Sequence, residues 1–287
     1  MYDVIIIGTG PAGITAGIYA KRSNLNVLII GKNKSALEKV KQIDNYYGLP
    51  HIDGKTLYLN GTKQVKELGV ELIDEEVIGI TMDYQNNSSF VIKTINSIFE
   101  TKTVILATGM LRTTPKIANL LNYVDTNISF CAICDGFFYR NKKVCVIGYN
   151  EYALEEAKEL LKVTPNVTIL TNGKARTFTN DPLIVVNTET IKAFKGEERI
   201  EQIELETSTL DVDGVFIAWG TPGGLEFAKK LGLELDNNMV ITNKNMETNI
   251  PGIYACGDMT GQPYQIHKAT YEGMQAALAI SKYLKNK

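Results

Sequence analysis

Two segments of the chain share one design, in which a hydrophobic run ends at a glycine and leads into a helix-forming stretch. The first runs from Asp3–Ile7 into Gly8–Gly13, with the letters G-T-G-P-A-G, and the second runs from Lys143–Ile147 into Gly148–Ala153, with the letters G-Y-N-E-Y-A. A strand, a glycine turn and a helix in this order open a β-α-β unit of a doubly wound parallel sheet. The chain is therefore predicted to be an α/β protein with two such units, each of them a candidate nucleotide site.

The first glycine turn has the complete G-x-G-x-x-G pattern. Gly8 permits the tight turn, Gly10 lets phosphate groups approach the backbone, and Gly13 lets the helix pack against the strand. The helix that begins there offers N–H groups and a partial positive charge to a pyrophosphate. The second strand, 26–30, is followed by glycine and lysine, so it lacks the acidic residue that binds a ribose 2′-hydroxyl. The predicted phosphate contacts of this dinucleotide site are Gly8, Gly10, Pro11, Ala12 and Gly13.

The second glycine turn departs from the pattern at its central position, where Asn150 replaces the glycine that would approach a pyrophosphate. Tyr149 stands just before it. A side chain at this position fills space that the phosphates need. We therefore expect no ordinary pyridine-nucleotide site here, and binding of NADH or NADPH in an altered pose is the alternative.

At 287 residues the chain is long enough for two domains with separate cores. Its hydrophobic content of 44% and charged content of 22% are ordinary for a globular protein, and its net charge of −2 argues against nucleic acid or an anionic membrane as a main partner. No apolar run reaches the roughly 20 residues of a membrane span, and we expect no signal peptide before the first strand. These features predict a cytoplasmic protein, in which a purely structural disulfide is rare.

Cys131 and Cys134 form a C-x-x-C motif, whose spacing permits a small disulfide ring. In a cytoplasmic protein such a motif carries out redox chemistry or holds a metal. Structural zinc needs about four ligands, whereas the whole chain has 4 cysteines and 2 histidines. Cys145 falls in a predicted strand and Cys256 precedes a Gly-Asp pair, so both are interpreted as small core residues. A redox-active disulfide is the favoured interpretation, and zinc is the alternative.

The remaining segments complete an alternating pattern of strands and helices. In the first half, strands are predicted at 70–73, 76–83, 89–94, 98–100 and 104–107, with a hairpin turn at 86–88. In the second half, strands are predicted at 167–170, in a meander over 184–206, and at 214–218, 239–241 and 252–255. Helices are predicted at 11–22, 55–67, 151–162, 225–231 and 265–285.

Further segments carry a resemblance to known flavoproteins: Ala107–Gly109, Ala255–Asp258, Asp44–Tyr46, and the C-x-x-C motif with the following Asp135–Phe138. With the complete glycine turn, they make nearly the whole chain resemble the low-molecular-weight thioredoxin reductases. The resemblance implies a two-dinucleotide-binding-domain flavoprotein, an α/β protein of two Rossmann-like three-layer domains that works as a head-to-tail homodimer with bound FAD. The FAD-binding domain is then discontinuous, over 1–112 and 222–287, and a central redox-disulfide domain, a degenerate NADPH-type domain, covers 113–221.

The family also implies roles for particular residues. Cys134 would face the flavin, Cys131 would exchange with the substrate disulfide, and Asp135 would serve as acid or base for the thiols. A carboxylate in the first turn of a helix is stabilising in any case, which is the alternative for Asp135. Asp258 would bind the ribityl chain of FAD, and the last helix would point its positive end at the flavin. The implied FAD contacts beyond the glycine turn are Asn45, Ala107, Thr108, Gly109, Gly257, Asp258 and Gln265.

The chain departs from the NADPH-dependent members of this family in its central domain. Those members have G-x-G-x-x-A where this chain has Gly148–Ala153, and they follow the next strand with arginines that grip a 2′-phosphate, where this chain has Thr171–Arg176. In this respect it resembles the flavin-dependent ferredoxin:thioredoxin reductases. We therefore expect an enzyme that passes electrons from ferredoxin or flavodoxin through FAD and the Cys131–Cys134 disulfide to thioredoxin. An NAD(P)H-dependent thioredoxin reductase, a flavoprotein oxidase and a redox sensor are the alternatives.

Overall fold

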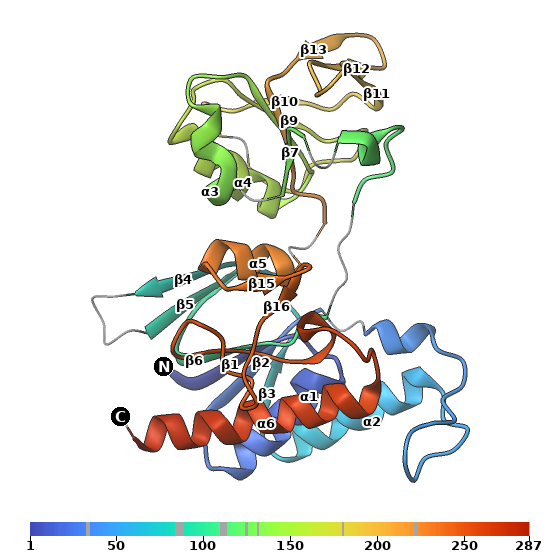
Figure 1. The fold of residues 1–287 in the computed structure, drawn as a ribbon, viewed down its shortest axis with the longest axis vertical. Helices are drawn as coiled ribbons and strands as arrows, with labels where there is room; N and C mark the ends of the chain where they lie inside the picture. The colour runs from blue at the N-terminus through green and yellow to red at the C-terminus, as the bar shows by residue number, and fades with distance from the viewer. Residues whose placement is uncertain are drawn as a thin grey trace. The chain divides into compact units, whose positions relative to one another are not determined.

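The computed structural model describes residues 1–32, 35–83, 89–109, 114–123, 126–130, 132–179, 181–220 and 223–286. The chain divides into two compact units, one made of Met1–Leu111 with Gly223–Lys287 and the other of Arg112–Pro222 (Figure 1). The first unit is thus built from both ends of the chain. The hairpin turn expected at 86–88 lies outside the described residues.

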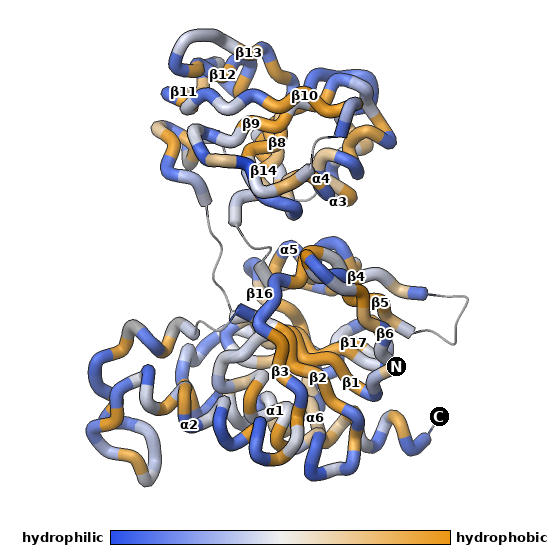
Figure 2. Tube along the Cα trace, turned by 180° about the vertical axis from the view of Figure 1, so that it is seen from behind, coloured by the Kyte–Doolittle hydropathy of each residue, from blue (hydrophilic) through white to orange (hydrophobic). Residues whose placement is uncertain are grey.

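A seven-stranded sheet forms the centre of the first unit, with the strand order β3-β2-β1-β6-β5-β4 and with β17 also paired to β6. Its parallel strands are β1 (Tyr2–Ile7), β2 (Val27–Ile30), β3 (Glu71–Ile73), the second half of β6 (Ile98–Leu106) and β17 (Ile253–Ala255). The antiparallel strands β4 (Val77–Asp83) and β5 (Ser89–Thr94) extend it. The buried positions of β1, Val4–Ile7, and the whole of β2 are covered on both faces and consist of β-branched and other apolar residues, as Figure 2 shows.

Helices cover both faces of this sheet. On one face α1 and α6 lie side by side, with α2 packed on α1, and α5 packs on the other face (Figure 1). Successive residues of β1 alternate between these layers: Val4 and Ile6 pack with α1 and α6, whereas Ile5 and Ile7 pack with Phe227 of α5. The other elements of the unit are α1 (Pro11–Arg22), η1 (Ala36–Lys39), α2 (Gly54–Glu67), α5 (Gly224–Leu231), β15 (Leu235–Asp236), β16 (Met239–Val240), η4 (Gly257–Thr260) and α6 (Ile266–Lys285).

The prediction of two separate strands at 98–100 and 104–107 is wrong, because β6 is continuous. Its first half pairs antiparallel with β5, and its second half pairs parallel with β1 and β17. Thr101 and Thr103 at the change of partner are fully buried. Their hydroxyls donate to the carbonyl oxygens of Thr103 (2.9 Å) and Asp3 (2.7 Å), respectively, so these polar residues stay within the strand.

The second unit contains a parallel sheet with the order β10-β9-β8-β14-β7. Its strands are β7 (Ile128–Ser129), β8 (Val144–Ile147), β9 (Val167–Leu170), β10 (Val185–Asn187) and β14 (Gly214–Ile217). The helical elements are η2 (Leu120–Tyr123), α3 (Ala132–Asp135), η3 (Gly136–Tyr139) and α4 (Glu151–Leu161), and α4 packs on β8 and β9.

The meander expected over 184–206 differs in the structure. Its first strand, β10, joins the parallel sheet beside β9, and only β11 (Ile191–Lys195) and β12 (Gln202–Leu205) continue as an antiparallel ribbon, which β13 (Thr209–Asp211) completes. A crossover to a parallel partner cannot be distinguished from a hairpin by the short apolar run alone. Within the ranges described, no helix has both the length and the apolar character that crossing a membrane requires.

Candidate active site

The turn between β1 and α1 contains three glycines that differ in what surrounds them. Gly8 has a φ of +122°, and a Cβ atom on it would overlap the carbonyl oxygen of Ala107. A Cβ atom on Gly13 would overlap the carbonyl oxygen of Gly8, whereas a Cβ atom on Gly10 would meet nothing within 4 Å. Packing therefore accounts for Gly8 and Gly13. The open space at Gly10 is what the close approach of a phosphate group requires.

The first turn of α1 is suited to an anion. Gly10 is the N-cap residue and makes no side-chain hydrogen bond to the helix, and Pro11 occupies the first helical position, where an N–H group is not needed. The backbone N–H groups of this turn and the helix dipole then favour a negatively charged ligand. This geometry fits the pyrophosphate of a dinucleotide.

Two more segments end at the same edge of the sheet. The N–H of Ala107, just after β6, donates to the last residue of β1 (2.8 Å), and the N–H of Cys256, just after β17, donates to the last residue of β6 (2.9 Å). Thr108 Oγ1 lies 3.9 Å from Met259 Sδ, and Gly109 has a φ of +67° with open space where a Cβ atom would stand. The carboxyl ends of β1, β6 and β17 thus converge, which is where open α/β sheets bind their ligands.

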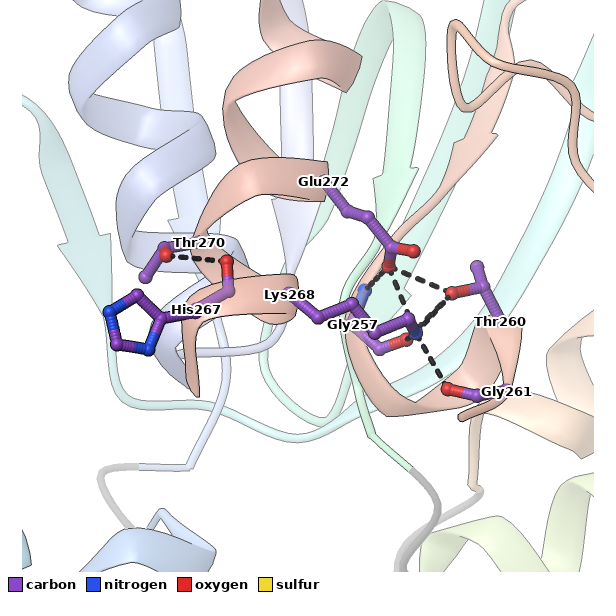
Figure 3. Close-up of polar contacts among 7 residues, drawn as sticks. All are labelled: Gly257, Thr260, Gly261, His267, Lys268, Thr270 and Glu272. Atoms are coloured by element: carbon purple, nitrogen blue, oxygen red, sulfur yellow. Dashed lines mark hydrogen bonds and ion pairs between the residues drawn. The ribbon is translucent and has the colours of Figure 1, made fainter. Parts of the chain in front are cut away.

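A buried ion pair holds the loop between β17 and α6 (Figure 3). Lys268 Nζ lies 3.2 Å from Glu272 Oε2 and donates to the carbonyl oxygens of Gly257 (2.9 Å) and Gly261 (2.6 Å) and to Thr260 Oγ1 (2.8 Å). Glu272 Oε2 in turn accepts the N–H of Gly257 (2.9 Å) and the hydroxyl of Thr260 (2.8 Å). These bonds fix the backbone on both sides of Asp258. Neither charged residue was predicted from the sequence, although their spacing of four on an otherwise apolar helix face was a usable signal.

Asp258 lies in η4, inside this loop. Burial raises the pKa of its carboxyl group above the ordinary value, with Glu272 raising the pKa further and Lys268 opposing the shift. Hydroxyl groups of a bound ligand would supply hydrogen bonds that favour the ionised form. A half-buried carboxylate at this edge therefore suits a polyhydroxyl chain such as ribityl.

A second contact joins the start of α6 to the segment before α2. Asn45 Nδ2 donates to Gln265 Oε1 at 3.0 Å, across 220 positions of sequence. The N–H of Tyr47 donates to His267 Nε2 (3.2 Å), and the ring of Tyr46 lies 4.7 Å from the His267 ring, centroid to centroid. The structure therefore brings Asn45 and Gln265 together as a pair.

The first unit fits FAD on three observations. The space at Gly10 is open, no side chain of the described residues caps the N-terminus of α1, and Asp258 is a half-buried carboxylate whose pKa is raised by burial. We assign the pyrophosphate to the glycine turn and the ribityl chain to Asp258 as proposals.

The C-x-x-C segment of the second unit, residues 131–134, is called the redox turn here, and it runs into α3. Cys131 lies outside the described residues, and Cys134 belongs to α3, with its side chain outside the description. Asp135 ends α3, and its Oδ2 accepts the hydroxyl of Ser129 at 2.7 Å. The N–H of Ala132 donates to Glu156 Oε2 on α4 at 2.8 Å. Ser129 and Glu156 thus join the candidate residues, and nothing in the local sequence pointed to either.

The second glycine turn is closed by its own side chains. Asn150 is the N-cap residue of α4, where its side chain accepts from the N–H of Ala153 (3.4 Å) and donates to the carbonyl oxygen of Gly220 (2.8 Å). The ring of Tyr149 packs edge-on against Trp219, with the centroids 4.9 Å apart. The equivalent of the open position at Gly10 is therefore filled. The side chain of Asn150 itself caps the N-terminus of α4, which a pyrophosphate would otherwise contact.

Replacing Lys268 with methionine should destabilise the protein by about 3–5 kcal/mol, because it leaves the Glu272 carboxylate buried without its cation. Urea unfolding followed by circular dichroism measures the loss. Lys282→Met, on the exposed side of the same helix, is the control and should change stability by less than about 1 kcal/mol. An equal effect of the two substitutions would contradict the structural role of the ion pair.

Comparison with known proteins shows the family to which the chain belongs. The chain matches the model of the pyridine nucleotide-disulphide oxidoreductases over residues 2–273. A thioredoxin reductase of Ureaplasma parvum is 34% identical over 306 residues, which cover 99% of this chain and 97% of the relative. A thioredoxin reductase of Borreliella burgdorferi is 32% identical over 307 residues, which cover 99% of this chain and 92% of that relative.

Solved structures extend the likeness to the whole fold. The atypical thioredoxin reductase of Desulfovibrio vulgaris Hildenborough superimposes with a TM-score of 0.89 at 35% identity, over 100% of this chain and 99% of that one. A ferredoxin-flavin thioredoxin reductase of Clostridium acetobutylicum superimposes with a TM-score of 0.67 at 30% identity, again over 100% of this chain and 99% of that one. The chain is therefore a member of the pyridine nucleotide-disulphide oxidoreductases, in their low-molecular-weight thioredoxin reductase group, whose cofactor is FAD.

Proposed function

We propose that this protein is an FAD-dependent disulfide reductase that takes electrons from reduced ferredoxin and passes them through Cys131–Cys134 to thioredoxin. Thioredoxin as the acceptor is supported by the names of its relatives. Ferredoxin as the donor is supported by the likeness to a ferredoxin-flavin thioredoxin reductase and by the closed second glycine turn. We also propose that it works as a homodimer, as the family resemblance implies.

The observation that carries the choice of donor is the side chain of Asn150. Its Oδ1 accepts the N–H of Ala153 at the start of α4, which also donates to the backbone carbonyl of Asn150, and its Nδ2 donates to the carbonyl oxygen of Gly220, three residues past the end of β14. A pyrophosphate would have to displace the Asn150 side chain. This would break the two hydrogen bonds of that side chain, each worth about 1 kcal/mol. At the first turn Gly10 offers no such competition. The second unit is thus poorly suited to a pyridine nucleotide.

Reduction of one disulfide to two thiols takes two electrons and two protons. FAD, when bound, supplies the capacity to accept electrons one at a time and to deliver two. Ferredoxin brings no protons, so groups on the protein or solvent must supply them. Asp135 follows the second cysteine directly, and its carboxylate accepts the hydroxyl of Ser129 at 2.7 Å, which holds the group in place; we propose that it serves as acid or base for the thiols.

Transfer to thioredoxin is then an ordinary thiol–disulfide exchange. The thiolate of Cys131 attacks one sulfur of the substrate disulfide, and the other substrate sulfur leaves and takes up a proton. Cys134 next attacks Cys131 in the mixed disulfide, which releases the second substrate thiol and re-forms Cys131–Cys134. One disulfide is consumed and one is formed, so electrons and protons balance.

A second candidate is an NAD(P)H-dependent thioredoxin reductase with an altered nucleotide pose. Lys174 and Arg176 favour it, because both follow β9 and are exposed, where they could meet a phosphate group. An oxidase and a redox sensor stay possible outcomes of the tests below. Steady oxygen consumption would indicate the oxidase.

The donor is tested by mixing the oxidised, FAD-loaded protein anaerobically with NADPH, NADH or reduced ferredoxin and following the flavin absorbance. We expect ferredoxin to bleach the flavin within seconds and the two nicotinamide nucleotides to bleach it at least about 100-fold more slowly, a difference of about 2.7 kcal/mol in barrier. Rapid bleaching by NADPH or NADH would replace the ferredoxin assignment with the second candidate. Bleaching by ferredoxin without thioredoxin turnover would point to another disulfide acceptor.

A further inference from the structure

Glu156 is a buried carboxylate with no part in the mechanism above. It lies on α4 with only 2% of its surface exposed, whereas Glu155, its neighbour in sequence, is partly exposed and pairs with Lys158. Burying a carboxylate is costly unless hydrogen bonds compensate for the lost water. Packing alone therefore does not account for an acidic residue at this position.

One partner of Glu156 is the backbone of the redox turn. Its Oε2 accepts the N–H of Ala132 at 2.8 Å, and Ala132 is itself buried. That N–H belongs to the peptide bond that joins Ala132 to Cys131. The carboxylate is thus tied to the first residue after the attacking cysteine.

The same helix also supports the other end of the turn. A Cβ atom on Gly136 would stand 3.3 Å from Leu160 Cδ2, so the backbone just after Asp135 lies against α4. Glu156 and Leu160 are one helical turn apart, on one face of α4. Helix α4, which follows the second glycine turn, therefore supports the C-x-x-C segment. This role does not depend on nucleotide binding.

A carboxylate that is hydrogen-bonded to the peptide group following Cys131 also bears on the redox balance of the proposed cysteine pair. Negative charge close to a thiol disfavours the thiolate. A dithiol whose reduced form is less stabilised is a stronger reductant, because stabilising the reduced form is what makes a disulfide oxidising. A reductase that must pass electrons on to thioredoxin gains from such a group.

We propose that Glu156 is a positioning residue that holds the redox turn and, through its charge, sets the reducing power of the Cys131–Cys134 pair. This inference rests on the proposed function, in which these two cysteines are the redox pair. Glu156 is proposed to act on the thiols through the backbone and through space, and it has no place in the electron-transfer steps.

The test compares Glu156→Gln with Glu155→Gln in the full-length, FAD-loaded protein. Glutamine keeps an oxygen that accepts the Ala132 N–H but removes the charge, and Glu155 offers the same substitution one position away, on a partly exposed side chain that pairs with Lys158. The first readout is the equilibrium of the disulfide with glutathione. The second is the rate at which iodoacetamide alkylates the reduced protein at pH 7.

For Glu156→Gln we expect the equilibrium to shift about tenfold toward the dithiol, which corresponds to about 30 mV for this two-electron couple. Alkylation should become about 5–10-fold faster, because the thiolate fraction rises. Glu155→Gln should match the wild type in both. If Glu156→Gln stays within twofold of the wild type in both readouts, the inference is overturned.

Failure of the proposed function gives a different result. When the wild-type protein is reduced and then alkylated, mass spectrometry must show that Cys131 and Cys134 are both modified. When the protein is alkylated without reduction, neither cysteine should be modified. If reduction exposes no new thiols there, the redox pair and the inference fall together. If both thiols appear and only the variants fail to shift, the redox pair stands and the role of Glu156 alone is wrong.

Discussion

Replacing Cys131 with serine should abolish thioredoxin turnover while leaving FAD bound. A serine hydroxyl is a far weaker nucleophile than a thiolate and cannot form the mixed disulfide, so we expect a loss of at least about a thousandfold, or about 4 kcal/mol in barrier. Cys134→Ser should lose as much, because the mixed disulfide can then no longer be resolved. The measurement is thioredoxin reduction by reduced ferredoxin, with FAD content read from the visible absorbance.

The other two cysteines of the chain are matched controls. Cys145 and Cys256 are free and fully buried, and burial raises the pKa of both thiols well above the ordinary value. A buried thiol of raised pKa is unreactive, so Cys145→Ala and Cys256→Ala should keep turnover within a few-fold. A redox sensor would behave differently, since Cys131→Ser would then change partner binding without any turnover to lose. Full turnover by Cys131→Ser would remove this cysteine from the mechanism.

Gly10→Val should yield a folded protein that no longer holds FAD. The backbone at Gly10 is extended, with a φ of −71°, and the space where the side chain would go is open, so valine can be accommodated in the folded chain. That space is where we place the pyrophosphate, and a branched side chain would exclude it. We expect FAD affinity to fall by at least about a thousandfold, or about 4 kcal/mol, as measured by titration calorimetry of the FAD-free protein.

Two other substitutions separate this effect from misfolding. Gly13→Val should prevent folding, because its Cβ atom would overlap the carbonyl oxygen of Gly8. Asn150→Val changes the equivalent position of the second unit and should leave FAD affinity unchanged, at a cost of about 1 kcal/mol for the lost helix cap. Wild-type FAD affinity in Gly10→Val would refute the placement of the pyrophosphate.

Much of the fold followed from local patterns. The strand, glycine and helix at the start of each unit appear where expected, in β1 with α1 and in β8 with α4, because buried parallel strands need continuous apolar runs and the turn needs glycine. The continuity of β6 did not follow, since its middle is polar and the strand is held together by partners on both sides. The pairing of β10 with β9 was likewise undetermined by a short apolar run.

The candidate site divides in the same way. The glycine turn, the C-x-x-C motif and the Gly-Asp pair are contiguous in sequence and recognisable there. Lys268 and Glu272 act through hydrogen bonds to backbone groups of η4 and the turn after it, and Glu156 acts on a peptide bond 24 positions earlier. Such contacts depend on which elements pack together.

By itself, the amino-acid sequence determined that the chain has two α/β units and that the second has an asparagine where the first has an open glycine. Only the tertiary structure decided what that asparagine does: it caps its own helix and bonds to Gly220, 70 positions away. The physical reason is that the replacement of glycine by asparagine can be read at one position of the sequence. The hydrogen bond from Asn150 to Gly220, by contrast, requires β8 and β14 to pair as neighbours.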